Sequence, residues 1–156
     1  MIRITPADIE ADKVGVIIGR CPEILTAWAA LDRQMRFSGR LSPELKEEVR
    51  RALAPGVGCV YCASLGEPAD SYSDPRVSLA VAYALLLMDP KSIEDETFEI
   101  LREEFSEEEI VELTCWSLFM IAGQGVGAAM RISASTAEEA ERYKSWRAEG
   151  QSASVR

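Results

Sequence analysis

The sequence predicts an all-α protein with one domain spanning residues 1–156. Three observations carry this prediction. Apolar residues recur at offsets of three, four and seven, which is the spacing of one helix face. Proline and capping residues stand where such segments begin, and no segment shows the alternation that is typical of a strand. With 156 residues, of which 47% are hydrophobic, the chain can bury a core of its own.

The first half of the chain holds three expected helices after a short lead-in. The first begins at Pro22 and ends at Gly39. The second has Ser42 as its cap and ends at the run Pro55–Gly58, because proline and glycine both disfavour a continuing helix. The third opens at Cys59.

The second half is expected to hold four more helices. Asp74 and Pro75 start a helix that runs to about Met88, and its continuous apolar run predicts burial on every side. An amphipathic helix covers Ile93–Phe105. Two capping boxes, each a Ser or Thr followed by Glu three residues later, then start the last two helices. These boxes are Ser106 with Glu109 and Thr136 with Glu139.

The uncharged segment Leu113–Met130 is almost long enough to span a membrane. It contains Gln124 and glycines at alternate positions, which favour close packing between helices, so we expect a buried helix. The glycines lack the spacing of a nucleotide-binding loop. The final helix is expected to be polar and to end near Glu149, with Gln151–Arg156 as a frayed tail.

Cys59 and Cys62 form the one close cysteine pair in the sequence. A cysteine at a helix N-terminus meets unpaired N–H groups and the positive end of the helix dipole, and both favour the thiolate. A second cysteine three residues later lies on the same face, within reach of a disulfide. The pair therefore indicates a redox-active dithiol, while two buried structural cysteines and half of a zinc site stay open as alternatives.

The residues around this pair resemble a known family. The run LSPELKEEVR at 41–50, followed by GCVYC at 58–62, is similar to the carboxymuconolactone decarboxylase superfamily. Within it, the chain looks like the alkylhydroperoxidase D branch, which carries Glu, eleven residues, Cys-x-x-Cys, three residues and His. Glu47 and the two cysteines have this spacing, and CPEIL at 21–25 and RFSG at 36–39 add to the likeness. The resemblance covers about residues 20–66 and implies the helical fold of that branch.

One position departs from the family pattern. The histidine of the branch falls at Gly66, and this chain contains no histidine at all. The expected fold is unaffected by this departure, whereas the expected proton relay is left incomplete.

The resemblance implies a thiol-dependent peroxidase. It assigns Cys62 as the peroxide-reacting cysteine, Cys59 as the resolving cysteine and Glu47 as the start of the proton relay. Tyr61, between the cysteines, is expected to pack rather than to orient a proton donor. The implied partners are a hydroperoxide substrate and an external dithiol reductant, and we expect neither a cofactor nor a metal.

Three alternatives to a peroxidase stay open. A lactone decarboxylase or isomerase, as in the founding branch, relies on acid–base residues and lacks the cysteine pair. A non-catalytic oligomeric member of the family would fit the loss of histidine. A zinc site would need Cys21 and Cys115, but neither has a paired spacing, and we expect both to be inert buried cysteines.

Composition limits the partners and the setting. A formal net charge of −9 argues against nucleic acid and against anionic membranes. Four cysteines without a signal peptide indicate a reducing, cytoplasmic location. The apolar helices expected at 75–88 and 110–132 exceed what a small monomer buries, and the resemblance implies trimers or hexamers, so we expect a homo-oligomer.

Overall fold

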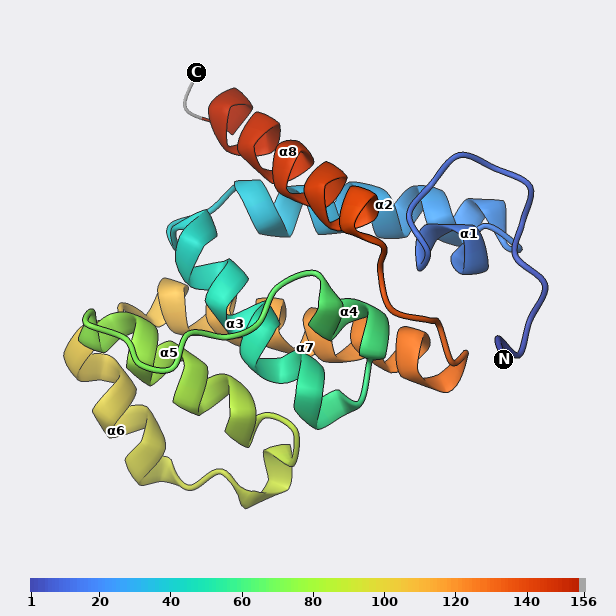
Figure 1. The fold of residues 1–156 in the computed structure, drawn as a ribbon. Helices are drawn as coiled ribbons and strands as arrows, with labels where there is room; N and C mark the ends of the chain where they lie inside the picture. Colours follow the sequence, from blue (N-terminus) through green and yellow to red (C-terminus); the bar gives the residue numbers. More distant parts are fainter. Residues whose placement is uncertain (155–156) are drawn as a thin grey trace.

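The computed structural model describes residues 1–154, which form helices joined by short connections (Figure 1). The all-α prediction is confirmed, since this described part of the chain contains no strand. A single 3₁₀ turn, η1, covers Pro90–Ser92. The α-helices are α1 (Gly15–Ile18), α2 (Pro22–Phe37), α3 (Pro43–Val57), α4 (Val60–Ser64), α5 (Pro75–Leu86), α6 (Asp95–Glu104), α7 (Glu107–Ala129) and α8 (Ala137–Ser154).

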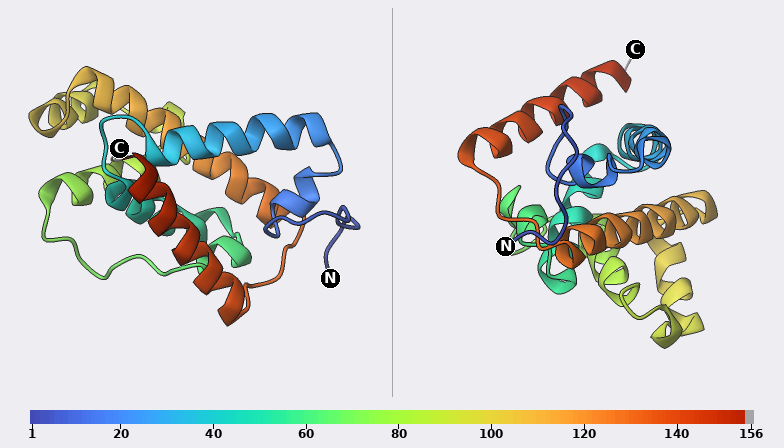
Figure 2. Two further views of the ribbon diagram at one scale, coloured as in Figure 1. Left: turned by 90° about the horizontal axis from the view of Figure 1, so that it is seen from above. Right: turned by 90° about the vertical axis from the view of Figure 1, so that its right-hand side faces the viewer.

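The centre of the fold is the packing of α3 against α7. Helices α2 and α8 lie on one side of this pair, and α5 and α6 lie on the other (Figures 1 and 2). Leu53 from α3 and Leu113 and Trp116 from α7 are fully buried in the main core. The indole N–H of Trp116 donates to the backbone oxygen of Lys46 at 2.8 Å, so a polar contact also fixes α7 on α3.

The expected helix starts are confirmed by their hydrogen bonds. The Ser42 hydroxyl accepts from the Leu45 N–H, and the Asp74 carboxylate accepts from the Arg76 N–H. Both capping boxes form, with the serine or threonine and the glutamate exchanging side-chain and backbone bonds. Each of these bonds satisfies a donor that a helix N-terminus leaves unpaired.

The end of α3 falls within the predicted run Pro55–Gly58. The helix continues through Pro55 and ends at Val57, because a proline in the last turn removes a single intrahelical bond. Gly58 then takes the left-handed conformation, with φ of +81°, and its N–H bonds back to the carbonyls of Ala54 and Pro55. This turn delivers Cys59 to the start of α4.

Of two further boundaries, one agrees with expectation and one does not. Helix α4 ends at Ser64, just before Gly66, as expected for a glycine that stops a helix early. Helix α8 runs past Glu149 to Ser154, so most of the expected frayed tail is helical. Residues 155 and 156 lie outside the described part of the chain.

The expected burial of the two apolar helices holds only in part. On α5, Leu85 and Leu86 are each 43% exposed. On α7, Val111 is 62% exposed and Leu118 is 41% exposed. Helix α7 is long and apolar enough to cross a membrane by length and composition, but its opposite face carries fully buried core residues, and a core helix passes the same test.

Candidate functional site

Cys59 and Cys62 are joined by a disulfide, with their Cα atoms 5.2 Å apart. Cys59 is the N-cap of α4, and its sulfur accepts the backbone N–H of Cys62 at 3.2 Å. The structure therefore places the pair at the N-terminal end of a helix, as the sequence predicts. Both residues belong to a second, smaller core that includes Ala54, Leu65 and Ile132.

Gly127 of α7 lies directly against the disulfide. A Cβ atom at this position would stand 2.5 Å from the Cys59 sulfur and 3.6 Å from the Cys62 sulfur. The expected close packing of the alternate glycines is thus confirmed at Gly127. It is absent at Gly125, where a Cβ atom would meet nothing within 4 Å. Sequence spacing gives no means of telling these two glycines apart.

A cavity of about 610 Å³ reaches one cysteine of the disulfide. Cys62 lines this cavity and Cys59 does not, in keeping with their exposed fractions of 7% and 1%. One part of its wall is apolar and aromatic, and another part carries polar and charged side chains. The apolar wall includes Ile18, Leu25, Trp28, Leu65, Phe119 and Met120, and the polar wall next to the dithiol includes Arg36, Arg50, Gln124 and Tyr143.

Glu47, the third residue that the resemblance singles out, is 2% exposed and sits among cations. Its carboxylate accepts two bonds from Arg50, both at 2.9 Å, and one from Arg51 at 3.0 Å. The guanidinium groups of Arg147 and Arg36 lie 3.5 and 3.7 Å from it. These contacts surround one buried negative charge with four positive charges.

Burial by itself would raise the pKa of Glu47, but the hydrogen bonds and charge of Arg50, with help from Tyr143 and Arg147, lower the pKa to about 2. Glu47 therefore stays ionised at neutral pH. In that state it accepts hydrogen bonds and holds its neighbours, and it does not exchange a proton. This differs from the proton-carrying role that the resemblance implies.

Arg50 links Glu47 to the dithiol. While two of its nitrogens donate to Glu47, the third donates to the backbone oxygen of Cys62 at 2.8 Å. The backbone oxygen of Arg50 in turn accepts from the Gln124 side-chain amide at 2.8 Å. The other amide atom of Gln124, its oxygen, is buried without a hydrogen-bond partner among the described residues. The spacing of Glu47 and the cysteines is thus matched by a physical connection through Arg50.

Tyr143 of α8 completes this arrangement and was missed in the sequence. Its hydroxyl donates to Glu47 at 2.7 Å and accepts from Arg36 at 3.0 Å. The guanidinium carbon of Arg50 lies 5.3 Å from the centre of its ring, a cation–π contact. The one available signal was the pair Tyr143 and Trp146, two aromatic residues three apart on an otherwise polar helix.

The remaining predicted residues fall into two groups. Tyr61 is buried in the small core, and the Lys13 ammonium lies 5.7 Å from its ring centre, which agrees with the expected packing role. Cys21 and Cys115 are exposed, so the expectation that both are buried is wrong. Within residues 1–154, no three potential metal ligands cluster.

Arg51 occupies the space next to Gly66, where the family histidine would stand. A Cβ atom at Gly66 would lie 3.0 Å from the Arg51 side-chain Nε, and the φ of +152° favours glycine. A side chain added at Gly66 would therefore meet the guanidinium of Arg51, which is bound to Glu47 and Glu48.

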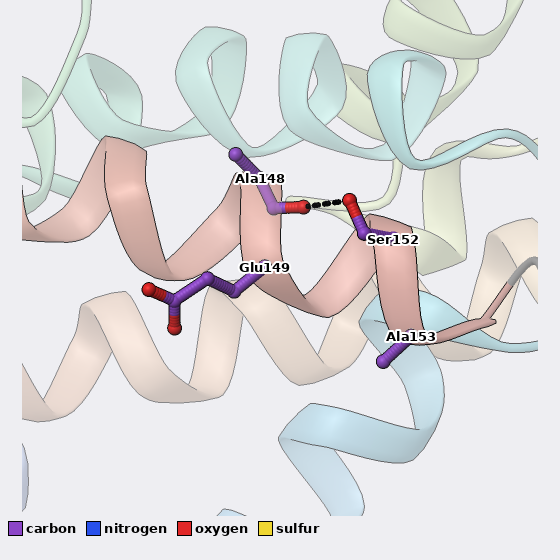
Figure 3. Close-up of a pocket in the computed structure, with 4 residues that line it drawn as sticks. All are labelled: Ala148, Glu149, Ser152 and Ala153. Carbon is purple, nitrogen blue, oxygen red and sulfur yellow. Dashed lines mark hydrogen bonds between the residues drawn. The ribbon is translucent and has the colours of Figure 1, made fainter.

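A second hollow lies on the surface of α8, lined by Ala148, Glu149, Ser152 and Ala153 (Figure 3). The Ser152 hydroxyl donates to the backbone oxygen of Ala148 at 3.0 Å. The Glu149 side chain points away from Ser152 (Figure 3), and among the residues that the structure describes no bond joins the two side chains.

The fold and the site together define an all-α protein with a disulfide-bonded Cys-x-x-Cys pair. One cysteine of the pair packs against α7, and the other borders a cavity with an apolar wall. No model of a known protein family matches the chain, and no curated protein matches its sequence. The argument for function accordingly rests on the residues themselves.

Proposed function

We propose that this protein is a thiol-dependent oxidoreductase of the alkylhydroperoxidase D type, which reduces hydroperoxides with Cys59 and Cys62. The observation that carries the proposal is the placement of the pair: Cys62 borders the cavity, while Cys59 packs behind it against Gly127. This is the arrangement that a reacting and a resolving cysteine need, because one sulfur must meet the substrate and the other must reach the first sulfur.

The reaction follows from thiol chemistry. The Cys62 thiolate attacks the terminal oxygen of a hydroperoxide, the O–O bond breaks, and a sulfenic acid forms while the second oxygen leaves and takes up a proton as an alcohol. The Cys59 thiol then displaces the sulfenic oxygen as water and forms the disulfide. Two electrons have passed from the dithiol to the peroxide. An external dithiol returns them and is itself oxidised to a disulfide.

The surroundings favour this chemistry at Cys62. The charged guanidinium of Arg50 lies against its backbone and borders the same cavity, and a nearby cation favours a thiolate over a thiol. The aromatic and aliphatic wall offers a place for the carbon skeleton of an organic hydroperoxide. Glu47 supports the site by holding Arg50 and Tyr143 in place.

The test compares single-cysteine variants of the reduced protein with an alkyl hydroperoxide. Wild type should consume one equivalent and lose two thiols, with mass spectrometry locating the new disulfide at positions 59 and 62. Cys62→Ser should abolish the reaction, and Cys59→Ser should stop at a sulfenic acid that dimedone traps. Cys115→Ser, at an exposed cysteine, is the matched control and should react like wild type.

Two outcomes would count against the proposal. If Cys62→Ser consumed peroxide as fast as wild type, the assigned chemistry would be wrong. If wild type did not react at all, the disulfide would be a structural crosslink, and the non-catalytic alternative would stand.

We further propose that the chain forms a homo-oligomer, a trimer or a hexamer, through the outer faces of α5 and α7. Exposed apolar side chains collect on these helices, and water contact with such side chains is unfavourable. These side chains are Leu85, Leu86, Val111 and Leu118. Light scattering at micromolar concentration tests this, and a clean monomer would refute it.

A further inference from the structure

The proposed reaction produces a strongly basic oxygen that must receive a proton, and the cavity contains few groups that can give one. Arginine does not release a proton in proteins. Four carboxylates line the cavity. Glu10 is exposed to solvent, and the other three act as acceptors: Asp12 accepts from the Gly15 N–H, Asp32 from Arg36, and Glu139 from the Thr136 N–H. Burial raises the pKa of Asp12, but among the described residues its carboxylate has no hydrogen-bonded link to the dithiol. Two phenols, those of Tyr61 and Tyr143, also line the cavity.

Tyr143 is the phenol that is tied to the dithiol. Its hydroxyl is bonded to Glu47, Glu47 to Arg50, and Arg50 to the backbone of Cys62, with no step longer than 2.9 Å. Its ring also packs against the small core that contains both cysteines. The Tyr61 ring lies beneath the Lys13 ammonium, on the side of the cavity near Asp12.

The surroundings of Tyr143 suit a group that gives a proton and takes it back. Burial raises the pKa of Tyr143, so the phenol keeps its proton at neutral pH, while the charges of Arg36 and Arg50 work in the opposite direction. After a proton leaves, the phenolate would stand against these two guanidinium groups, which stabilise a negative charge. Tyr143 also lines the cavity that Cys62 borders, so both residues face the same space.

We infer that the Tyr143 hydroxyl is the catalytic acid of the site and protonates the oxygen that leaves when Cys62 cleaves the hydroperoxide. This inference rests on the proposed function. In the step, the O–H bond of Tyr143 breaks and a new O–H bond forms on the leaving alkoxide, which departs as an alcohol. The phenolate regains its proton from water before the next turnover.

The test uses two oxidants that differ in their need for an acid. An alkyl hydroperoxide releases an alkoxide, which needs a proton, whereas peracetic acid releases acetate, which leaves without one. Tyr143→Phe removes the hydroxyl and keeps the ring. It should slow the alkyl hydroperoxide reaction by about 100-fold, the lower end of the usual effect of general acid catalysis, and leave the peracetic acid reaction within about twofold.

Two control variants accompany this measurement. Tyr61→Phe removes the other phenol of the cavity, and Tyr83→Phe removes a buried hydroxyl that bonds to Thr114 in the main core. Tyr83→Phe should react with each oxidant like wild type, and Tyr61→Phe should show no loss that is selective for the alkyl hydroperoxide. If Tyr61→Phe shows the selective loss instead, the acid has been assigned to the wrong tyrosine.

The outcomes separate this inference from the proposed function. If wild type reacts with the alkyl hydroperoxide and Tyr143→Phe reacts equally fast, the inference is overturned and the proposed function stands. Equal loss with both oxidants would show a structural role for Tyr143 and also overturn it. If Cys62→Ser reacts with the alkyl hydroperoxide as fast as wild type, the proposed function itself fails.

A second measurement does not depend on the folding of Tyr143→Phe. A fluorinated tyrosine at position 143 keeps the hydroxyl and lowers its pKa. The charged groups that face it come from three helices: Asp32 and Arg36 of α2, Glu47 and Arg50 of α3, and Arg147 of α8. The alkaline limb of the pH–rate profile should move to lower pH with the alkyl hydroperoxide, and an unmoved limb would overturn the inference.

Discussion

Substitution of two glycines on α7 should have opposite effects on stability. Alanine is favoured over glycine in a helix interior by about 1 kcal/mol. Gly125→Ala adds a methyl group in open space, so it should gain most of this amount, and a gain of 1 kcal/mol in a chain of this size raises the melting temperature by about 2–4 °C. Gly127→Ala has the same helix gain, but its methyl group would lie 2.5 Å from the Cys59 sulfur.

The cost at Gly127 follows from the rigidity of its neighbour. A sulfur held in a disulfide cannot turn away, so the backbone of α4 or α7 must shift. Overpacking of this kind costs about 1–3 kcal/mol, which outweighs the helix gain and leaves a net loss of up to ~2 kcal/mol. Thermal unfolding of the oxidised proteins, followed by circular dichroism, measures both variants under identical conditions.

A double-mutant cycle with Cys59→Ala isolates the contact. Removing the sulfur removes the clash, so Gly127→Ala should cost less in that background than in wild type, by roughly 1 kcal/mol or more. A result in which Gly127→Ala is as stable as Gly125→Ala, with its disulfide intact by mass spectrometry, would refute the close approach of α7 to the dithiol.

Two further predictions concern the charged cluster and the position of the missing histidine. Glu47→Gln leaves buried guanidinium groups without their counter-charge and should cost about 3–5 kcal/mol in urea unfolding, whereas the control Glu48→Gln, at a partly exposed pair, should cost about 0–1 kcal/mol. Because the pKa of Glu47 is lowered from 4.5 to about 2, the stability that its carboxylate contributes is present above pH 4.5 and is lost as the pH falls from 4.5 to about 2. A Glu47→Gln protein that loses as much stability as wild type over this pH interval would contradict the assignment. Gly66→His should lower the melting temperature, at a cost of about 1–3 kcal/mol for the backbone strain, and should not speed peroxide reduction, because Arg51 lies next to this position. Gly66→Ala is the control: it carries the same backbone strain and the Cβ contact with Arg51, without the imidazole. A faster Gly66→His protein would show that the imidazole fits.

Local patterns in the sequence predicted most of the fold. The starts of the helices at Ser42, Asp74 and Ser106 were correct, because a cap depends on a side chain and on backbone groups two or three residues away. The end of α3 also fell within the predicted run Pro55–Gly58, at Val57, where Gly58 supplies the left-handed turn. The end of α8 was less accurate, because that helix runs past Glu149 to Ser154.

Burial was harder to predict than helix position. The apolar run on α5 indicated a helix buried on every side, yet Leu85 and Leu86 face solvent. Conversely, Lys46 is fully buried, since its ammonium group donates to the carbonyls of Met35 and Ser38 at the end of α2. Such pairings join segments that are distant in space until the chain folds, and composition does not show them.

The residues of the candidate site also differ in whether the sequence could predict them. Glu47, Cys59 and Cys62 lie within one stretch of 16 residues. The cysteine spacing singled out the pair, and the resemblance to a family pattern added Glu47. Their setting depends on residues from elsewhere: Arg36 from α2, and Tyr143 from α8, which is 96 residues away from Glu47 in sequence. No local pattern links these positions, and only the packing of α2 and α8 over α3 brings them together.

The four guanidinium groups around Glu47 explain why its carboxylate is a poor proton carrier and a good anchor. Each added cation lowers the carboxylate's affinity for a proton, and each also gains a fixed partner in a buried setting. In the proposed reaction Glu47 therefore does not supply the proton, because its proton affinity is too low at neutral pH. We assign that role to Tyr143, a neighbouring group whose pKa is raised by burial and whose hydroxyl is bonded to Glu47.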